Sequence, residues 1–149
     1  MNLSKNVRIS QAITPTGGAA GTTDINGATL DMQGYEGVLM VVTFGAIVAG
    51  AVTSIKAQQG AQSNLSDAAD LAGTGQTVAD DDDEKTFYID LYRPTERYVR
   101  LVVDRGTQNA TVAEALYIQY GQQGGRKSPS SHGSNVSGEM HASPAEGTA

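Results

Sequence analysis

Short segments in which apolar and polar residues alternate constrain this fold more than any other feature of the chain. Successive side chains of a strand point to opposite faces, so a period of two is typical of half-buried β-strands. Residues 85–92 and 97–104 both show it, with Pro94 between them at a position that suits a β-turn. The two segments are predicted to form a hairpin. Its six core side chains are predicted to be Phe87, Ile89, Leu91, Val99, Leu101 and Val103.

A long uncharged stretch lies between Glu36 and Lys56. It approaches the roughly 20 apolar residues of a membrane span. However, Gly45 and Gly50 interrupt it, and its β-branched residues favour strands. We therefore expect two strands joined by a turn at 45–50. Residues 38–44 are apolar on both faces, which predicts a central strand covered on both sides, whereas 51–57 has one weaker apolar face and is expected nearer an edge.

Four further segments complete the pattern. Residues 28–33 are predicted to be a half-buried strand with Leu30 and Met32 inward. Residues 112–120 are predicted to be the last strand, with Leu116 and Ile118 inward and Tyr117 and Gln119 outward, although 111–116 also suits a helix. Residues 6–13 alternate and suit an edge strand or an extended arm. Only 63–72 has the serine and leucine pattern of one or two helical turns.

Six to eight short strands with glycine-rich turns predict an all-β fold. We expect an antiparallel β-sandwich, jelly-roll-like or immunoglobulin-like, with extended N- and C-terminal arms. The expected organisation is an N-terminal arm and first strand at 1–27, a sandwich core at 28–120, and a Gly/Ser-rich extended tail at 121–149.

The tail has almost no apolar side chains. Ordering a residue costs about 1–2 kcal/mol, so this tail is expected to be disordered alone and ordered only against a neighbouring subunit. The alternative is a loose terminus of the usual kind. The tail residues predicted to contact another chain are Arg126, Lys127, Val136, Met140 and His141.

The composition argues against several functions. The chain has no cysteine, and its net charge of −6 argues against nucleic acid as the main partner. Both histidines lie in the tail, so no general base is expected in the core. The glycine-rich 17–21 lacks the lysine of a phosphate loop. No catalytic residue, cofactor, small-molecule substrate or membrane association is expected, and the first ten residues lack the apolar run of a signal peptide, which predicts synthesis in the cytoplasm.

The acidic run at 80–84 is the strongest charge cluster. Calcium prefers oxygen ligands, but consecutive carboxylates diverge, and the spacing of a calcium-binding loop is absent. No metal is therefore predicted here. We interpret the run as a solvated loop that discourages unwanted edge pairing.

The sequence Thr-Leu-Asp-Met-Gln-Gly-Tyr-Glu-Gly at 29–37, the apolar strand after it, and Arg-Tyr-Val-Arg-Leu-Val-Val at 97–103 resemble small head proteins of tailed bacteriophages. The resemblance is to capsid decoration or cement proteins, and it covers roughly residues 28–120. It implies a structural virion protein that binds the outside of the capsid and contacts the major capsid protein and neighbouring copies of itself, as a homo-oligomer. The N-terminal arm at 2–16 and the tail are expected to make these contacts.

Two other classes remain open. A carbohydrate-binding module of a phage fibre or cell surface can use the same sandwich, with Tyr88, Tyr92 and Tyr98 stacking on sugar rings. The same tyrosine face can instead meet a protein partner. An enzyme is the third class, and the carboxylates that it would need are more simply exposed strand and turn residues.

Overall fold

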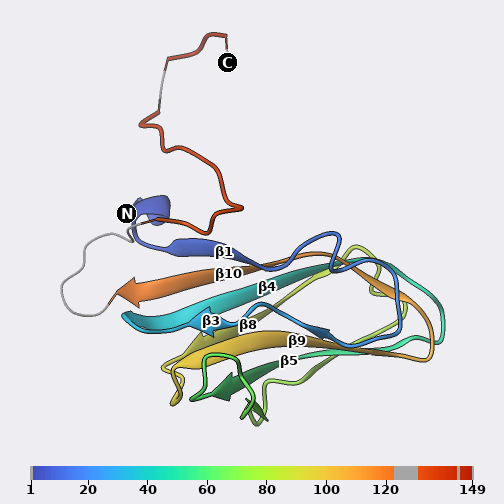
Figure 1. Cartoon of the computed structure of the whole chain (residues 1–149). Helices are drawn as coiled ribbons and strands as arrows, with labels where there is room; N and C mark the ends of the chain where they lie inside the picture. The colour runs from blue at the N-terminus through green and yellow to red at the C-terminus, as the bar shows by residue number, and fades with distance from the viewer. Residues whose placement is uncertain (1, 123–130, 144, 149) are drawn as a thin grey trace.

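The computed structural model describes residues 2–122, 131–143 and 145–148, and it is a sandwich of two antiparallel sheets (Figure 1). The predicted all-β sandwich is confirmed. Sheet A contains, in spatial order, β1 (Arg8–Ile13), β10 (Ala110–Gln122), β4 (Tyr35–Ile47) and β8 (Thr86–Tyr92). Sheet B contains β2 (Ile25–Asn26), β9 (Tyr98–Gly106), β5 (Val52–Gly60) and β6 (Ala69–Asp70), with β3 (Leu30–Asp31) on β9 and β7 (Gln76–Val78) on β5. A short 3-10 helix, η1 (Leu3–Lys5), precedes β1.

The connectivity is that of a jelly roll. β2 and β3 can be counted as one interrupted strand, and so can β6 and β7, which gives eight strands. The first of these pairs with the last (β1 with β10), the second with the seventh (β2 and β3 with β9), the third with the sixth (β4 with β8), and the fourth with the fifth (β5 with β6 and β7). The sheet orders follow from this nested pairing, which distinguishes a jelly roll from the immunoglobulin arrangement. Of the two predicted topologies, the structure therefore selects the jelly roll.

The nested pairing overturns the predicted hairpin, and although the expected turn joins β4 to β5, these two strands do not pair either. β8 pairs with β4 in sheet A, whereas β9 pairs with β5 in sheet B, so 85–92 and 97–104 do not form a hairpin. β4 and β5 likewise belong to different sheets. In both cases the connection crosses from one sheet to the other. The alternation of polar and apolar residues indicates which face of a strand is buried, but it does not indicate which strand lies beside it. The hairpin was predicted because the two segments are close in the sequence, and this criterion failed.

The core lies between the sheets and is formed by one face of each strand. Ile89, Val99, Leu101 and Val103 are buried as predicted, while Phe87 and Leu91 are partly buried against the core. β4 is central in sheet A, as expected, but only one of its faces is fully buried. In β5 the predicted face of Thr53, Ile55 and Ala57 is buried. Leu30 in β3 and Met32 just after it are also buried, as predicted. β1 is the edge strand of sheet A, which decides between the strand and the extended arm for 8–13.

The predicted orientation of the last strand is wrong. Tyr117 and Gln119 are the buried residues, 1% and 0% exposed, whereas Leu116 and Ile118 are on the outer face of sheet A and half-buried. The pairing of β10 with β4 shifts register between Ala110 and Glu114. An extra residue in a bulge exchanges the inward and outward faces beyond it. The apolar face of the last strand therefore points away from the core.

The predicted helical turns at 63–72 are also wrong. Leu65 is buried with a φ of +52°, which no right-handed helix allows. Asp67 instead accepts hydrogen bonds from the backbone N–H of Ala61 and Gln62, and β6 then pairs with β5. Local side-chain to backbone bonds of this kind compete with a helix.

Candidate functional site

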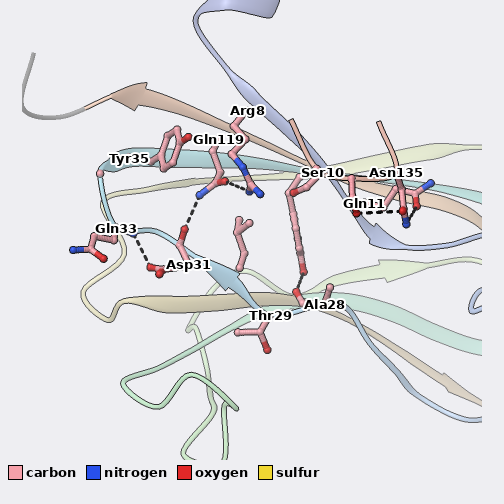
Figure 2. A pocket seen from close by; sticks show the side chains of 15 residues that line it. Arg8, Ser10, Gln11, Ala28, Thr29, Asp31, Gln33, Tyr35, Gln119 and Asn135 are labelled. Atoms are coloured by element: carbon pink, nitrogen blue, oxygen red, sulfur yellow. Dashed lines mark hydrogen bonds between the residues drawn. The ribbon is translucent and has the colours of Figure 1, made fainter. Parts of the chain in front are cut away.

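A polar cleft lies where the edges of the two sheets meet, between the edge strand β1 and residues 28–34 (Figure 2). We call this boundary between the sheets the seam. Its volume is about 850 Å³. β1 supplies Arg8, Ser10 and Gln11, β10 supplies Tyr117 and Gln119, and the tail supplies 133–135. The cleft exists because the outer strand of each sheet has a neighbour on one side only.

Two buried polar side chains of β10 reach across this seam. Gln119 Nε2 donates a hydrogen bond to the carbonyl oxygen of Asp31 (2.8 Å), and its Oε1 accepts one from Arg8 Nη1 (3.0 Å) (Figure 2). The Tyr117 hydroxyl donates to the carbonyl oxygen of Ala28 (2.9 Å) and accepts from the N–H of Leu101 (2.8 Å). Burial raises the pKa of the Tyr117 hydroxyl well above its usual range. Both side chains therefore fasten sheet A to the 28–34 connection and to sheet B.

The cleft is lined by polar side chains that include Arg8, Gln11 and Asn135. Among the described residues, the hydroxyl of Ser10 is buried without a hydrogen-bond partner, so no general base accompanies it. The same part of the chain contains no group of three or more metal-ligating side chains. Nor is any of its helices long and apolar enough to cross a membrane.

The tail is anchored on the free edge of β1. Gly133 N–H donates to the carbonyl oxygen of Ile9 (2.8 Å), and His132 Nδ1 accepts from the N–H of Ile9 (3.1 Å). Asn135 Nδ2 donates to Gln11 Oε1 (3.1 Å). A Cβ on residue 133 would lie 3.0 Å from that of Ser10, so the glycine permits the close approach. We call residues 131–136 the anchor. It satisfies polar groups of an edge strand that would otherwise be open to pairing.

Beyond the anchor the chain leaves the sandwich (Figure 1). We call residues 137–148 the arm, and all of its described residues are exposed. Of the predicted contact residues, Val136 is half-buried at the end of the anchor, and Met140 and His141 are on the arm. His141 pairs with Glu139 at 3.3 Å. Arg126 and Lys127 lie outside the described residues.

The three predicted tyrosines do not share one face. Tyr88 and Tyr92 are 63% and 57% exposed on β8, at the outer face of sheet A. Tyr98 lies on β9 in sheet B, with the Arg97 guanidinium 5.1 Å from its ring centre. The predicted shared face depended on the hairpin and fails with it.

The acidic run acts as a set of backbone acceptors. Asp83 Oδ1 accepts from the N–H of Ile47, and Asp80 Oδ2 from the N–H of Gly50, both at 2.6 Å. The Lys85 ammonium beside Asp82 holds the pKa of that carboxyl below its usual value. The run therefore ties the β7–β8 connection to the β4–β5 connection.

Sequence reasoning missed Arg8, Tyr117, Gln119 and the anchor residues. Tyr117 and Gln119 were predicted to point outward because the bulge in β10 cannot be recognised from the alternation of polar and apolar residues. His132, Gly133 and Asn135 indicate docking of the tail only when β1 is known to be an edge strand with a free side.

A scan against protein-family models and searches of curated proteins and solved structures found no match.

Proposed function

We propose that the chain is a structural, non-enzymatic subunit that decorates the outside of a tailed-phage capsid. The observation that carries the proposal is the anchor followed by an exposed arm. The proposal assigns the chain to the virion and gives it the major capsid protein and neighbouring copies as partners. The resemblance of 28–120 to head decoration proteins supports the same function.

The physical reason concerns how such an arm gains free energy. All of its described residues are exposed, and none of them belongs to the core cluster of the sandwich. An arm of this kind orders when a partner provides the apolar surface and backbone hydrogen bonds that its own domain does not. Contacts that exist only in the assembled particle stabilise that particle by mass action.

The jelly roll is compatible with this function but does not select it. The same fold occurs in viral capsid proteins and in lectins, and a fold alone does not define a function. The arm is the feature that favours an assembly role over an isolated domain.

Sedimentation with capsids tests the proposal. Heads of the phage that encodes the chain, prepared without it, are mixed with the full chain and with a variant that ends at Val136. We expect the full chain to sediment with the heads and the variant to bind at least tenfold more weakly. A variant that lacks the arm but binds equally, or a full chain that stays in the supernatant, would contradict the proposal.

Limited proteolysis gives a second readout. Arg126 and Lys127 are the only Lys or Arg residues after Arg105, so trypsin cleavage there releases the anchor and arm together. We expect cleavage to be slowed on the capsid. Equal rates for the free and capsid-bound chain would count against contact by the tail.

One observation favours a second candidate, the carbohydrate-binding module. Tyr88 and Tyr92 lie on the same face of β8 and are more than half exposed. Aromatic rings in such a position stack on sugars through their faces, but the Arg93 guanidinium already lies 5.1 Å from the Tyr92 ring centre. A glycan array would decide this: binding that is lost in Tyr88→Ala supports the candidate, and an array without any signal removes it.

A further inference from the structure

The middle of the outer face of sheet A is apolar, and its aliphatic side chains are only half-buried within the chain. Paired residues of adjacent strands share a face, so the register defines two rows across the sheet. One row runs Gln11, Leu116, Val41, Tyr88, and the next runs Ile9, Ile118, Leu39, Asp90. None of these side chains belongs to the core cluster. We call the eight residues the sheet A face.

The outer face of sheet B is different. Lys56 pairs with Asp70 (3.0 Å) and with Asp104 (3.3 Å), and Arg100 Nε donates to Gln58 Oε1 (2.8 Å). This is the polar exterior expected of a sheet that faces water. Sheet A differs because its outer aliphatic side chains are only half-buried and Tyr88 is 63% exposed, and a contiguous apolar patch of this kind is typical of an interaction surface.

The two carboxylates at this surface are turned to their neighbours. Glu114 Oε1 accepts from Gln11 Nε2 at 3.3 Å, and Asp90 accepts from the Tyr120 hydroxyl, whose ring lies over Gly37. The centre of the sheet A face therefore carries no charge. A chain with a net charge of −6 can approach a second copy there with little repulsion.

We propose that the sheet A face binds a second copy of this chain, sheet A against sheet A, about a two-fold axis parallel to the strands. This axis places β1 of one copy over β8 of the other, and β10 over β4. Leu116 then faces Val41 of the second copy, and Ile118 faces Leu39. Asp90 faces Ile9, so no carboxylate meets a carboxylate. The surface is thus complementary to itself, which a two-fold contact requires.

The size of the face sets the expected strength. Four strands about 4.8 Å apart and the seven residues of β8, which include the outer rows on either side of the sheet A face, give roughly 19 by 24 Å, or about 450 Å² on each copy. About 900 Å² in total lies below the range of stable interfaces and within that of weak, transient ones. The contact should therefore be a reversible dimer that dissociates on dilution. This dimer would form without a capsid, so the proposal goes beyond the decoration function and can be tested independently of it.

Sedimentation equilibrium on the purified full chain tests the contact, with a matched pair of substitutions. Val41→Lys puts a charge at the centre of the face, and Val52→Lys makes the same change on β5, where the side chain is 67% exposed. We expect the wild type and Val52→Lys to approach twice the monomer mass at high concentration. Val41→Lys should dimerise at least tenfold more weakly. A wild type that stays monomeric at about 1 mM, a concentration at which interfaces of millimolar affinity associate, overturns the proposal.

Two further tests, which use three other variants, keep the proposal falsifiable if Val41→Lys fails to fold. Tyr88→Glu changes a side chain that is already 63% exposed and should also weaken the dimer. Because the chain has no cysteine, Val41→Cys and Val52→Cys can be cross-linked by a short bismaleimide. Covalent dimers should form through residue 41 and not through residue 52. Equal cross-linking at both positions, or a folded Tyr88→Glu with wild-type association, overturns the proposal.

Discussion

Removal of the Tyr117 hydroxyl should reveal how the two sheets are held together. Gly27 N–H still donates to the carbonyl oxygen of Leu101 on β9, but the chain then turns away from β9, and Ala28 N–H donates to the carbonyl oxygen of Ala12 in sheet A. This interruption leaves the N–H of Leu101 facing the core, where the Tyr117 hydroxyl accepts its hydrogen bond at 2.8 Å. Tyr117 is 1% exposed and Leu101 is 0% exposed, so water cannot replace the acceptor.

The magnitude of the effect follows from these contacts. Tyr117→Phe leaves a buried donor unpaired, at about 1–3 kcal/mol, and removes a second bond to Ala28 worth about 0.5–1.5 kcal/mol. The expected loss of unfolding free energy is about 3 kcal/mol, or roughly 10 °C in melting temperature for a domain of this size. Urea unfolding followed by circular dichroism measures it. Tyr88→Phe removes the same atom from a 63% exposed ring and should change stability by less than about 0.5 kcal/mol.

The pH dependence provides a second readout of the same substitution. Burial raises the pKa of Tyr117, and burial with Asp90 raises that of Tyr120 to about 12. Above pH 10 the unfolded chain releases these protons and the folded chain does not, so stability falls by up to about 1.4 kcal/mol per pH unit for the buried Tyr117 and by less for the more exposed Tyr120. Tyr117→Phe should lower this slope between about pH 10 and 12. An unchanged slope, or a stability loss no larger than that of Tyr88→Phe, would refute the reasoning.

Two other substitutions test the packing and the anchor. Gly18→Ala places a Cβ 2.0 Å from a backbone carbonyl oxygen and should destabilise by about 2–3 kcal/mol in the same urea assay. Gly75→Ala meets nothing within 4 Å and is the control; equal effects would contradict the steric argument. Gly133→Val places a Cβ 3.0 Å from that of Ser10, tighter than an ordinary contact, and should loosen the anchor, whereas Gly138→Val meets nothing within 4 Å and is the control. Trypsin should then cleave after Arg126 or Lys127 faster in Gly133→Val than in Gly138→Val, and equal rates would show that the anchor does not dock.

The sequence allowed the buried faces of most strands to be predicted, because a period of two reports which side of a strand is apolar. It did not allow the neighbours to be predicted. β8 and β9 are close in the chain, but their hydrogen-bond partners, β4 and β5, lie more than 30 residues earlier. The pairing of a jelly roll is dominated by such distant contacts, which leave no local signal.

The candidate site was harder to predict than the fold because it depends on a bulge in β10, the second of two register shifts in its pairing with β4. Without the shift between Val112 and Glu114, Leu116 and Ile118 would point inward, as their apolar character suggests. With it, the core receives Tyr117 and Gln119, whose polar ends are satisfied across the seam.

The displaced aliphatic residues are not compensated elsewhere in the chain. Ile118 and Leu39 are neighbours on the outer face and are half-buried there, so complete burial would add only part of the about 1.5–3 kcal/mol that burying a fully exposed side chain is worth. A sheet face that stays in contact with water is expected to carry polar residues, as the outer face of sheet B does at Lys56 and Arg100. The bulge therefore does more than reorient one strand. It divides β10 into a polar face that holds the sandwich together and an apolar face that remains available to a second molecule.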